Sequence, residues 1–335
     1  MKNSFERIPL SILKNTLFRT CRIAVTVILM MAFCLSSVSP VTPVSSESLR
    51  REPASSLREI VDVCTSSPTI GADTTWIAGN IYAINSCVVV VSSGATLSLE
   101  PGVVVQFGGP STGLIIEGNL SAVGTSSAPV VFTSSNDNSD SGGSNTANPG
   151  DWWGIVLREG SNAAFDYAHI RYAGSDTCVG AFMDTNYNSC YNRAQLDARK
   201  ATLSMDHSVV TSGETTGLFL AGDGLAPVVQ NSVFENNSSD DSSNEGSAIQ
   251  QTTINMQPTY SNLTFNGNDR NQVVIPVGVL NQDVTLGGAP TGFTCGSNYC
   301  PITVADTHTL TIQPGAQLDM TLGYPIFYQI GRAHV

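Results

Sequence analysis

The sequence has few charged residues, and basic residues are the rarest of them. Charged side chains make up 13% of the 335 residues, and positions 60–329 hold six basic residues against 23 acidic ones, a net charge of −17. Such a surface repels nucleic acid, anionic lipid and acidic polysaccharide at long range. We therefore expect no nucleic-acid partner, and we favour neutral glycans, cations or surface proteins.

The sequence also lacks an apolar run long enough for a typical membrane-spanning helix, which needs about 20 residues. The apolar run at residues 23–35 follows Lys2, Arg7, Lys14, Arg19 and Arg22 and precedes a segment of small residues at 36–46. This order is typical of a secretory signal peptide. We expect residues 1–46 to direct export, the mature protein to be secreted or extracellular at the cell surface, and no spanning segment to remain after signal removal.

No CxxC pair is present, which argues against a cysteine-bound metal. Two of the eight cysteines lie in the export region, and an exported protein with an even six remaining predicts structural disulfides. Chain order suggests three pairs, although six cysteines allow 15 pairings. The suggested pairs are Cys64 with Cys87, Cys178 with Cys190, and Cys295 with Cys300.

Recognisable catalytic motifs are missing as well. A polysaccharide lyase needs a base and cationic groups, but Arg199 and Lys200 are adjacent and would point to opposite faces of a strand. A glycosidase needs clustered carboxylates, and the one adjacent acidic pair beyond the export region, Asp240 and Asp241, lies in a polar, loop-like run. We name no catalytic residue and lean against an enzyme.

What is abundant is Ser, Thr, Asn, Val and 30 glycines, a composition typical of short strands joined by tight turns. Residues 87–102, CVVVVSSGATLSLEPG, align without a gap on residues 300–315, CPITVADTHTLTIQPG. Alternation in TLSL places the leucines on one face of a strand, and Pro-Gly then supplies a turn. A repeat at this distance indicates duplicated architecture, and strands this short favour a stacked solenoid.

A second repeat is degenerate and begins at Asp166, Met205, Val229 and Tyr260, with each unit ending in Gly or Asn. Those two residues tolerate the left-handed backbone that a corner requires. In this alignment Asp206-His207 shares a column with Tyr167-Ala168, Gln230-Asn231 and Ser261-Asn262. Asp206-His207 has the composition of an acid–base pair, but the column favours a stacked polar rung or a solvated turn.

Together, four segments resemble the bacterial secreted right-handed parallel β-helix repeat proteins of the pectin-lyase-like fold. They are 94–107 (GATLSLEPGVVVQF), 118–137 (GNLSAVGTSSAPVVFTSSND), 149–157 (PGDWWGIVL) and 165–174 (FDYAHIRYAG). The resemblance implies an all-β, right-handed parallel β-helix, a solenoid, over residues 76–329. The repeat of residues 87–102 at 300–315 predicts a second, truncated repeat unit from about 295. Residues 47–75 are expected to be a linker and a short N-terminal cap, because Ser56 and Glu59 have capping-box spacing for a helix.

One insertion, residues 136–151, is rich in oxygen ligands. We predict calcium as a possible cofactor there, held by Asp137, Asp140 and Asp151, although the ordered spacing of an EF-hand is absent. Trp152 and Trp153 follow at once and are candidates for stacking on a sugar, while at least one is expected to pack against a rung. Trp153 stands where similar sequences have Gly, so an extra exposed aromatic is expected.

These observations favour a non-catalytic role in attachment, surface architecture or glycan contact; the alternative is a polysaccharide lyase or glycoside hydrolase of the same fold.

The last six residues, 330–335, are left out of this interpretation. They match a codon-by-codon translation of a sequencing-adapter sequence, and we expect the natural protein to continue beyond Gln329.

Overall fold

The computed structural model describes residues 58–66, 68–139, 146–177, 183–184, 189–190, 194–239, 246–296, 299–319 and 324–329. The chain divides into two units, Met1–Ser55 and Ser56–Val335, and all the described residues lie in the second. Their one helix is the single turn α2 (Val63–Ser66). None of these residues belongs to a helix with the length and hydropathy that a membrane crossing requires.

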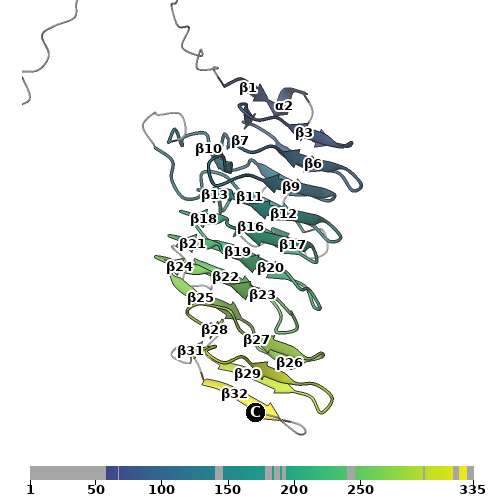
Figure 1. The fold of residues 1–335 in the computed structure, drawn as a ribbon, viewed down its shortest axis with the longest axis vertical. Helices are drawn as coiled ribbons and strands as arrows, with labels where there is room; N and C mark the ends of the chain where they lie inside the picture. The colour runs from purple at the N-terminus through teal and green to yellow at the C-terminus, as the bar shows by residue number, and fades with distance from the viewer. Residues whose placement is uncertain are drawn as a thin grey trace, which may run out of the picture. The chain divides into compact units, whose positions relative to one another are not determined.

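Nearly all other regular structure is short parallel strands in three sheets, stacked coil upon coil as Figure 1 shows. The seven-stranded sheet contains β3 (Thr74–Trp76), β6 (Thr96–Leu99), β9 (Asn119–Val123), β12 (Asn162–Asp166), β17 (Thr202–Asp206), β20 (Val228–Gln230) and β23 (Thr259–Ser261). The eight-stranded sheet contains β1 (Ile60–Asp62), β4 (Ile81–Ile84), β7 (Val104–Phe107), β10 (Val130–Ser134), β13 (Ala168–Arg171), β18 (Val209–Thr211), β21 (Val233–Glu235) and β24 (Thr264–Asn266).

The ten-stranded sheet completes each coil. It contains β2 (Thr69–Ile70), β5 (Val88–Val91), β8 (Gly113–Ile116), β11 (Gly154–Leu157), β16 (Ala194–Arg199), β19 (Thr216–Ala221), β22 (Ser247–Gln251), β25 (Arg270–Ile275), β28 (Phe293–Cys295) and β31 (Leu318–Asp319). From β3 to β13 the chain visits the seven-, eight- and ten-stranded sheets in that fixed order, and from β16 to β25 it does so again. This is a right-handed parallel β-helix, and the predicted fold class is confirmed.

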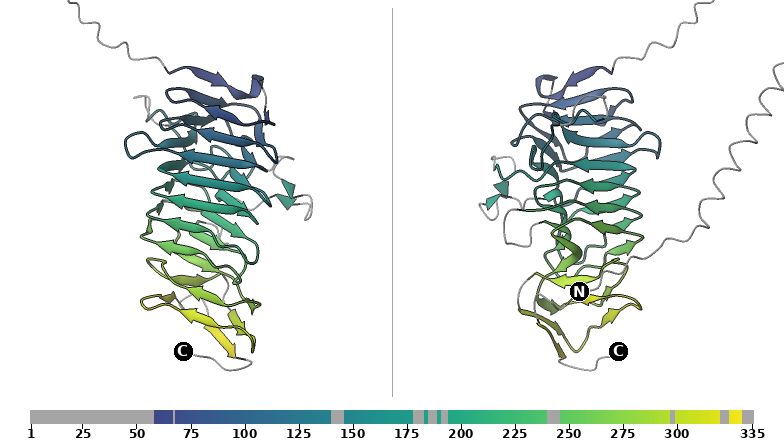
Figure 2. Two further views of the ribbon diagram at one scale, coloured as in Figure 1. Left: turned by 45° about the vertical axis from the view of Figure 1, so that its right-hand side comes forward. Right: turned by 90° about the vertical axis from the view of Figure 1, so that its left-hand side faces the viewer.

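The last coils use smaller sheets. Parallel strands β26 (Gly278–Leu280), β29 (Tyr299–Val304) and β32 (Tyr324–Gln329) form one, and β27 (Val284–Leu286) with β30 (Leu310–Ile312) forms another. An antiparallel pair, β14 (Met183–Asp184) with β15 (Ser189–Cys190), interrupts the coil between β13 and β16. Figure 2 shows that the stacking continues through the yellow C-terminal coils.

A column of apolar side chains fills the interior behind the ten-stranded sheet. Its members pair in register from coil to coil, and all of them are buried except the last, which is half-buried. Each coil therefore covers the apolar face of the next, as a solenoid requires. The column is Val89, Leu114, Ile155, Leu196, Leu218, Ile249, Val273, Phe293 and Leu318.

The N-terminal end differs from the expectation. The residues expected to continue a capping-box helix form strand β1, which pairs in parallel with β4, and the helix α2 starts only at Val63. Pairing therefore begins at Ile60 and not at 76, because Val61 packs against the interior and the backbone of β1 extends the eight-stranded sheet. The expected helix at this position is wrong.

The first predicted disulfide is present: Cys64 in α2 joins Cys87, just before β5, with Cα atoms 5.7 Å apart. It ties the first coil to the second. Cys295 is also disulfide-bonded. The side chains of Cys178, Cys190 and Cys300 lie outside the described part of the chain, so the other two suggested pairs stay predictions.

Candidate functional site

Polar side chains follow one another from coil to coil where the seven-stranded sheet ends. Asp166 ends β12 and pairs in register with Asp206, the last residue of β17, and Gln230 of β20 continues the row. After each strand the chain turns through one residue with left-handed backbone. These residues are Tyr167, His207, Asn231 and Asn262, with φ of 46°, 43°, 49° and 49°. We call these seven residues the corner column.

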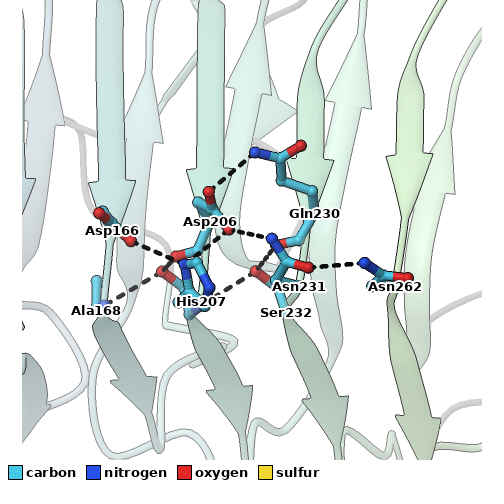
Figure 3. Close-up of polar contacts among 9 residues, drawn as sticks. Asp166, Ala168, Asp206, His207, Gln230, Asn231, Ser232 and Asn262 are labelled. Carbon is cyan, nitrogen blue, oxygen red and sulfur yellow. Dashed lines mark hydrogen bonds and ion pairs between the residues drawn. The ribbon is translucent and has the colours of Figure 1, made fainter. Parts of the chain in front are cut away.

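Figure 3 shows that the corner column, apart from Tyr167, is one connected network of contacts between coils. Asn262 Nδ2 donates to Asn231 Oδ1 at 2.9 Å, and Asn231 Nδ2 donates to Asp206 Oδ1 at 2.8 Å. Gln230 Nε2 donates to the other oxygen, Asp206 Oδ2, at 2.9 Å. The carboxylate of Asp206 is thus held on both oxygens by the following coil.

His207 lies against two carboxylates. Its Nδ1 is 2.9 Å from Asp206 Oδ1 and 3.4 Å from Asp166 Oδ1, and its ring stacks on Tyr167 with centroids 4.6 Å apart and planes 5° from parallel. The ligand atoms of Asp166, Asp206 and His207 all lie within 4.8 Å of one another. This trio combines two carboxylates and one imidazole on a partly exposed corner.

The charge of Asp206 is stabilised by its neighbours. Burial alone would raise the pKa of this carboxyl, but hydrogen bonds from Asn231 and Gln230, the electrostatic interaction with His207 and a backbone hydrogen bond from His207 outweigh it. The pKa of Asp206 is therefore lowered from its ordinary value. A carboxyl ionised in this way accepts hydrogen bonds or binds a cation, and it is poorly suited to donate a proton as a general acid.

Register explains why sequence alignment missed the meeting of Asp166 with Asp206. Phe165, and not Asp166, pairs with Met205, so the first unit of the degenerate repeat begins one residue earlier than predicted. The predicted positions of the left-handed residues that end each unit were also wrong by one or two residues. After the strands of the eight-stranded sheet, the left-handed backbone falls on Tyr172, Ser212, Asn236 and Gly267, which in the last three units is one residue before the predicted Gly or Asn. An alignment that matched the two large buried residues, Phe165 and Met205, would have placed Asp166 opposite Asp206.

The predicted calcium ligand Asp137 lies in the interior of its loop. Its side chain is 0% exposed and pairs with Arg171 Nη2 at 2.9 Å. Thr133 Oγ1 donates to Oδ2 at 2.6 Å, and Ser139 donates to Oδ1 through its N and Oγ. Burial would raise the pKa of Asp137, but the hydrogen bonds from Ser139 and Thr133 and the charge of Arg171 together lower it.

Asp151 closes the other end of the insertion. Its Oδ2 accepts hydrogen bonds from Ser134 Oγ at 2.6 Å, Asn136 Nδ2 at 3.1 Å and Asn148 N at 3.2 Å. Both described aspartates therefore tie the insertion to the solenoid through protein donors. Asp140 lies outside the described residues, and the calcium hypothesis stays a prediction.

Trp152 is an interior residue and offers no ring face to a sugar. It is 0% exposed, stacks on Phe107 with centroids 3.9 Å apart, and donates its indole hydrogen to the backbone oxygen of Arg171 at 2.7 Å. This confirms that one tryptophan packs against a rung.

Trp153 is buried as well, and the expectation that it is an exposed, sugar-stacking aromatic is wrong. It is 2% exposed and clusters with Ile115 of β8 and Val156 of β11. Those two side chains point outward from the ten-stranded sheet, away from the interior column, and the indole covers them. Apolar residues on the outer sheet face thus explain a tryptophan at this position.

The two adjacent basic residues that were considered for lyase chemistry contact different partners. Arg199 pairs with the buried Asp197 at 3.0 Å on the outer face of the ten-stranded sheet. Lys200, just after β16, lies 3.4 Å from Glu159 with both side chains largely exposed. Asp240 and Asp241 lie outside the described residues.

The coils, sheets and corners place this chain in the class of parallel β-helix proteins. Residues 68–178 match the family model described as a pectate-lyase like beta helix domain. Comparison with curated proteins and comparison with solved structures each returned no significant match.

Proposed function

We propose that this protein is a secreted or cell-surface β-helix that acts without catalysis, in attachment, surface architecture or glycan contact. One observation carries the proposal: the acid–base side chains that the sequence offered are used to hold neighbouring coils together. Asp206 receives hydrogen bonds from the next coil on both oxygens, and His207 is stacked on Tyr167 of the preceding coil. A general acid or base needs a side chain free to exchange its proton with substrate.

Other features of the chain support export. The signal-like order of basic, apolar and small residues precedes the solenoid, and a disulfide joins Cys64 to Cys87. Disulfides persist in oxidising compartments outside the cytosol.

The outer face of the seven-stranded sheet supports contact with neutral glycans. Thr96, Asn119, Asn162 and Thr202 pair in register along it. Asn162 Nδ2 donates to Asn119 Oδ1 at 3.0 Å, which leaves hydroxyl and amide groups in a repeating, uncharged row. Such groups can exchange hydrogen bonds with sugar hydroxyls without the penalty of burying a charge.

The test measures binding and turnover in one preparation. The mature protein is incubated with pectate, alginate and neutral β-glucans. We expect retention by a neutral glycan, with no new unsaturated products or reducing ends. Asn162→Ala should weaken retention, while Asp306→Asn, in an exposed turn, should leave it unchanged.

The rival function is polysaccharide cleavage by a lyase or glycoside hydrolase. Product formation that Asp206→Asn, Asp241→Asn or Lys200→Ala abolishes would overturn the non-catalytic proposal. Equal retention of the parent and Asn162→Ala would remove the seven-stranded sheet as the glycan-contacting face.

A further inference from the structure

We propose that Asp166, Asp206 and His207 form a binding site for a divalent transition-metal ion of the zinc class. The bound ion would link the two neighbouring coils that contain β12 and β17. The proposal goes beyond the proposed function, because it adds ion binding to corner-column residues that the proposed function uses only to hold neighbouring coils together. It is also separate from the calcium hypothesis for the insertion at 136–151.

The spacing of the three side chains suits a metal with short bonds. Zinc bonds to nitrogen and oxygen are about 2.0–2.2 Å, so two ligands lie about 3.0 Å apart at a right angle and about 3.4 Å apart at the tetrahedral angle. His207 Nδ1 is 2.9 Å from Asp206 Oδ1 and 3.4 Å from Asp166 Oδ1. An ion can therefore lie between His207 and each of the two carboxylates with little movement of these ligand pairs.

A second observation is an oxygen without a hydrogen-bond donor. Among the described residues, Asp166 Oδ1 is inaccessible to solvent and receives no hydrogen bond, although it faces His207 Nδ1. Leaving a buried acceptor unsatisfied is costly, and the cost is greater for a charged group. A cation between Asp166 and His207 would satisfy this oxygen.

The ligands are already oriented by their surroundings, as Figure 3 shows. Parallel pairing of β12 with β17 sets Asp166 beside Asp206, and Asn231 and Gln230 fix the carboxylate of Asp206. Partners that hold a ligand in place commonly strengthen metal binding by a factor of 10 to 100.

The ligand types favour zinc and its neighbours over calcium. Calcium takes six to eight oxygen ligands, whereas an imidazole nitrogen suits zinc, copper and nickel. The side chains of Asp166 and His207 are 39% and 42% exposed, so water can complete the coordination shell. Binding requires the neutral imidazole, with its hydrogen on Nε2.

The chain provides a conservative variant for the test. Asn231 and Asn262 occupy the position of His207 in the next two coils with nearly the same backbone, so His207→Asn preserves the corner while removing the imidazole. Asp166→Asn removes one carboxylate charge and keeps its shape. Asp306→Asn and His308→Asn are matched controls elsewhere in the solenoid.

Calorimetric titration with zinc chloride, and cobalt absorption spectra, should detect one site per chain in the parent after chelator treatment. We expect His207→Asn and Asp166→Asn each to weaken zinc binding at least tenfold, with circular dichroism unchanged, and neither control to do so. Zinc should raise the melting temperature of the parent and not of His207→Asn. Equal zinc binding by the parent and both site variants, or no binding by the parent, would overturn the proposal. If one of the two site variants loses the circular dichroism spectrum of β structure, the zinc affinity of the other site variant tests the proposal.

Discussion

At the scale of single residues, Asp137 is a candidate calcium ligand whose carboxylate is already held by groups of the protein itself. Loop sequences rich in Asp and Asn are typical of calcium sites and equally of loops that bind their own backbone and neighbours. The side chain of Asp137 is fully buried against Arg171. Its charge is compensated within the protein.

This arrangement predicts acid sensitivity. The pKa of Asp137 is lowered in the folded state, so its contribution to stability is fully present above the unfolded value of about 3.9. It is lost as the pH falls through the lower folded value. The free energy of unfolding should therefore fall less steeply with decreasing pH in Asp137→Asn than in the parent. Denaturant unfolding at several acidic pH values measures this difference.

The same variant should also be less stable at neutral pH, by about 3–5 kcal/mol, because it removes the buried carboxylate that lies 2.9 Å from Arg171 Nη2. Asp176→Asn, at an exposed position, is the control. A parent and an Asp137→Asn variant with identical pH profiles would contradict this assignment.

At the scale of elements, a buried amide network joins the eight-stranded sheet to the ten-stranded sheet. Asn237 Nδ2 donates to Asn268 Oδ1 at 2.8 Å and to Val210 O at 3.2 Å. Its Oδ1 accepts from Gln195 Nε2 at 2.6 Å and from Gly213 N at 3.3 Å. Asn237 thereby satisfies backbone and side-chain groups of the coils on both sides of it.

Leaving one buried polar group unsatisfied costs about 1–3 kcal/mol. Because Asn237 has several buried partners, Asn237→Ala should lower the free energy of unfolding by an amount near the top of this range. Chemical denaturation monitored by circular dichroism measures the loss. Asn266→Ala, an exposed residue at the end of β24, should change stability little. Similar losses in both variants would show that the network does not stabilise this corner.

At the scale of the whole solenoid, each coil contacts mainly its two neighbours, so a defect should be felt locally. Leu218 is fully buried in the interior column between Leu196 and Ile249. A cavity at this position removes contacts from both adjacent coils.

Leu218→Ala should cost about 3–5 kcal/mol of stability. Hydrogen exchange should accelerate most in β16, β19 and β22 and least in the distant strand β5. The control Ser204→Ala changes an outward-facing residue of β17. Uniform acceleration along all coils would mean that the solenoid unfolds as a single unit.

Much of the fold could be predicted because its signals are local. Alternation in TLSL, the Pro-Gly turns and the gapless repeat of residues 87–102 each depend on a few adjacent residues. The Cys64 to Cys87 pair followed from chain order in the same way. The expected helix near Ile60 failed because pairing with β4 overrode a local capping signal.

The candidate site depended on register, which adjacent residues do not specify. A shift of one residue in the repeat alignment exchanges inward and outward faces, and here it concealed the pairing of Asp166 with Asp206. The burial of Trp153 likewise depends on Ile115 and Val156, residues that reach it from different strands. The sequence by itself determined the solenoid class and the acidic charge, because strand periodicity and composition are properties of the chain. Only the tertiary structure decided which carboxylates meet and which aromatic rings are covered, because the pairing of successive coils brings Asp206 to Asp166 and Ile115 to Trp153, residues that are 40 and 38 positions apart in the chain.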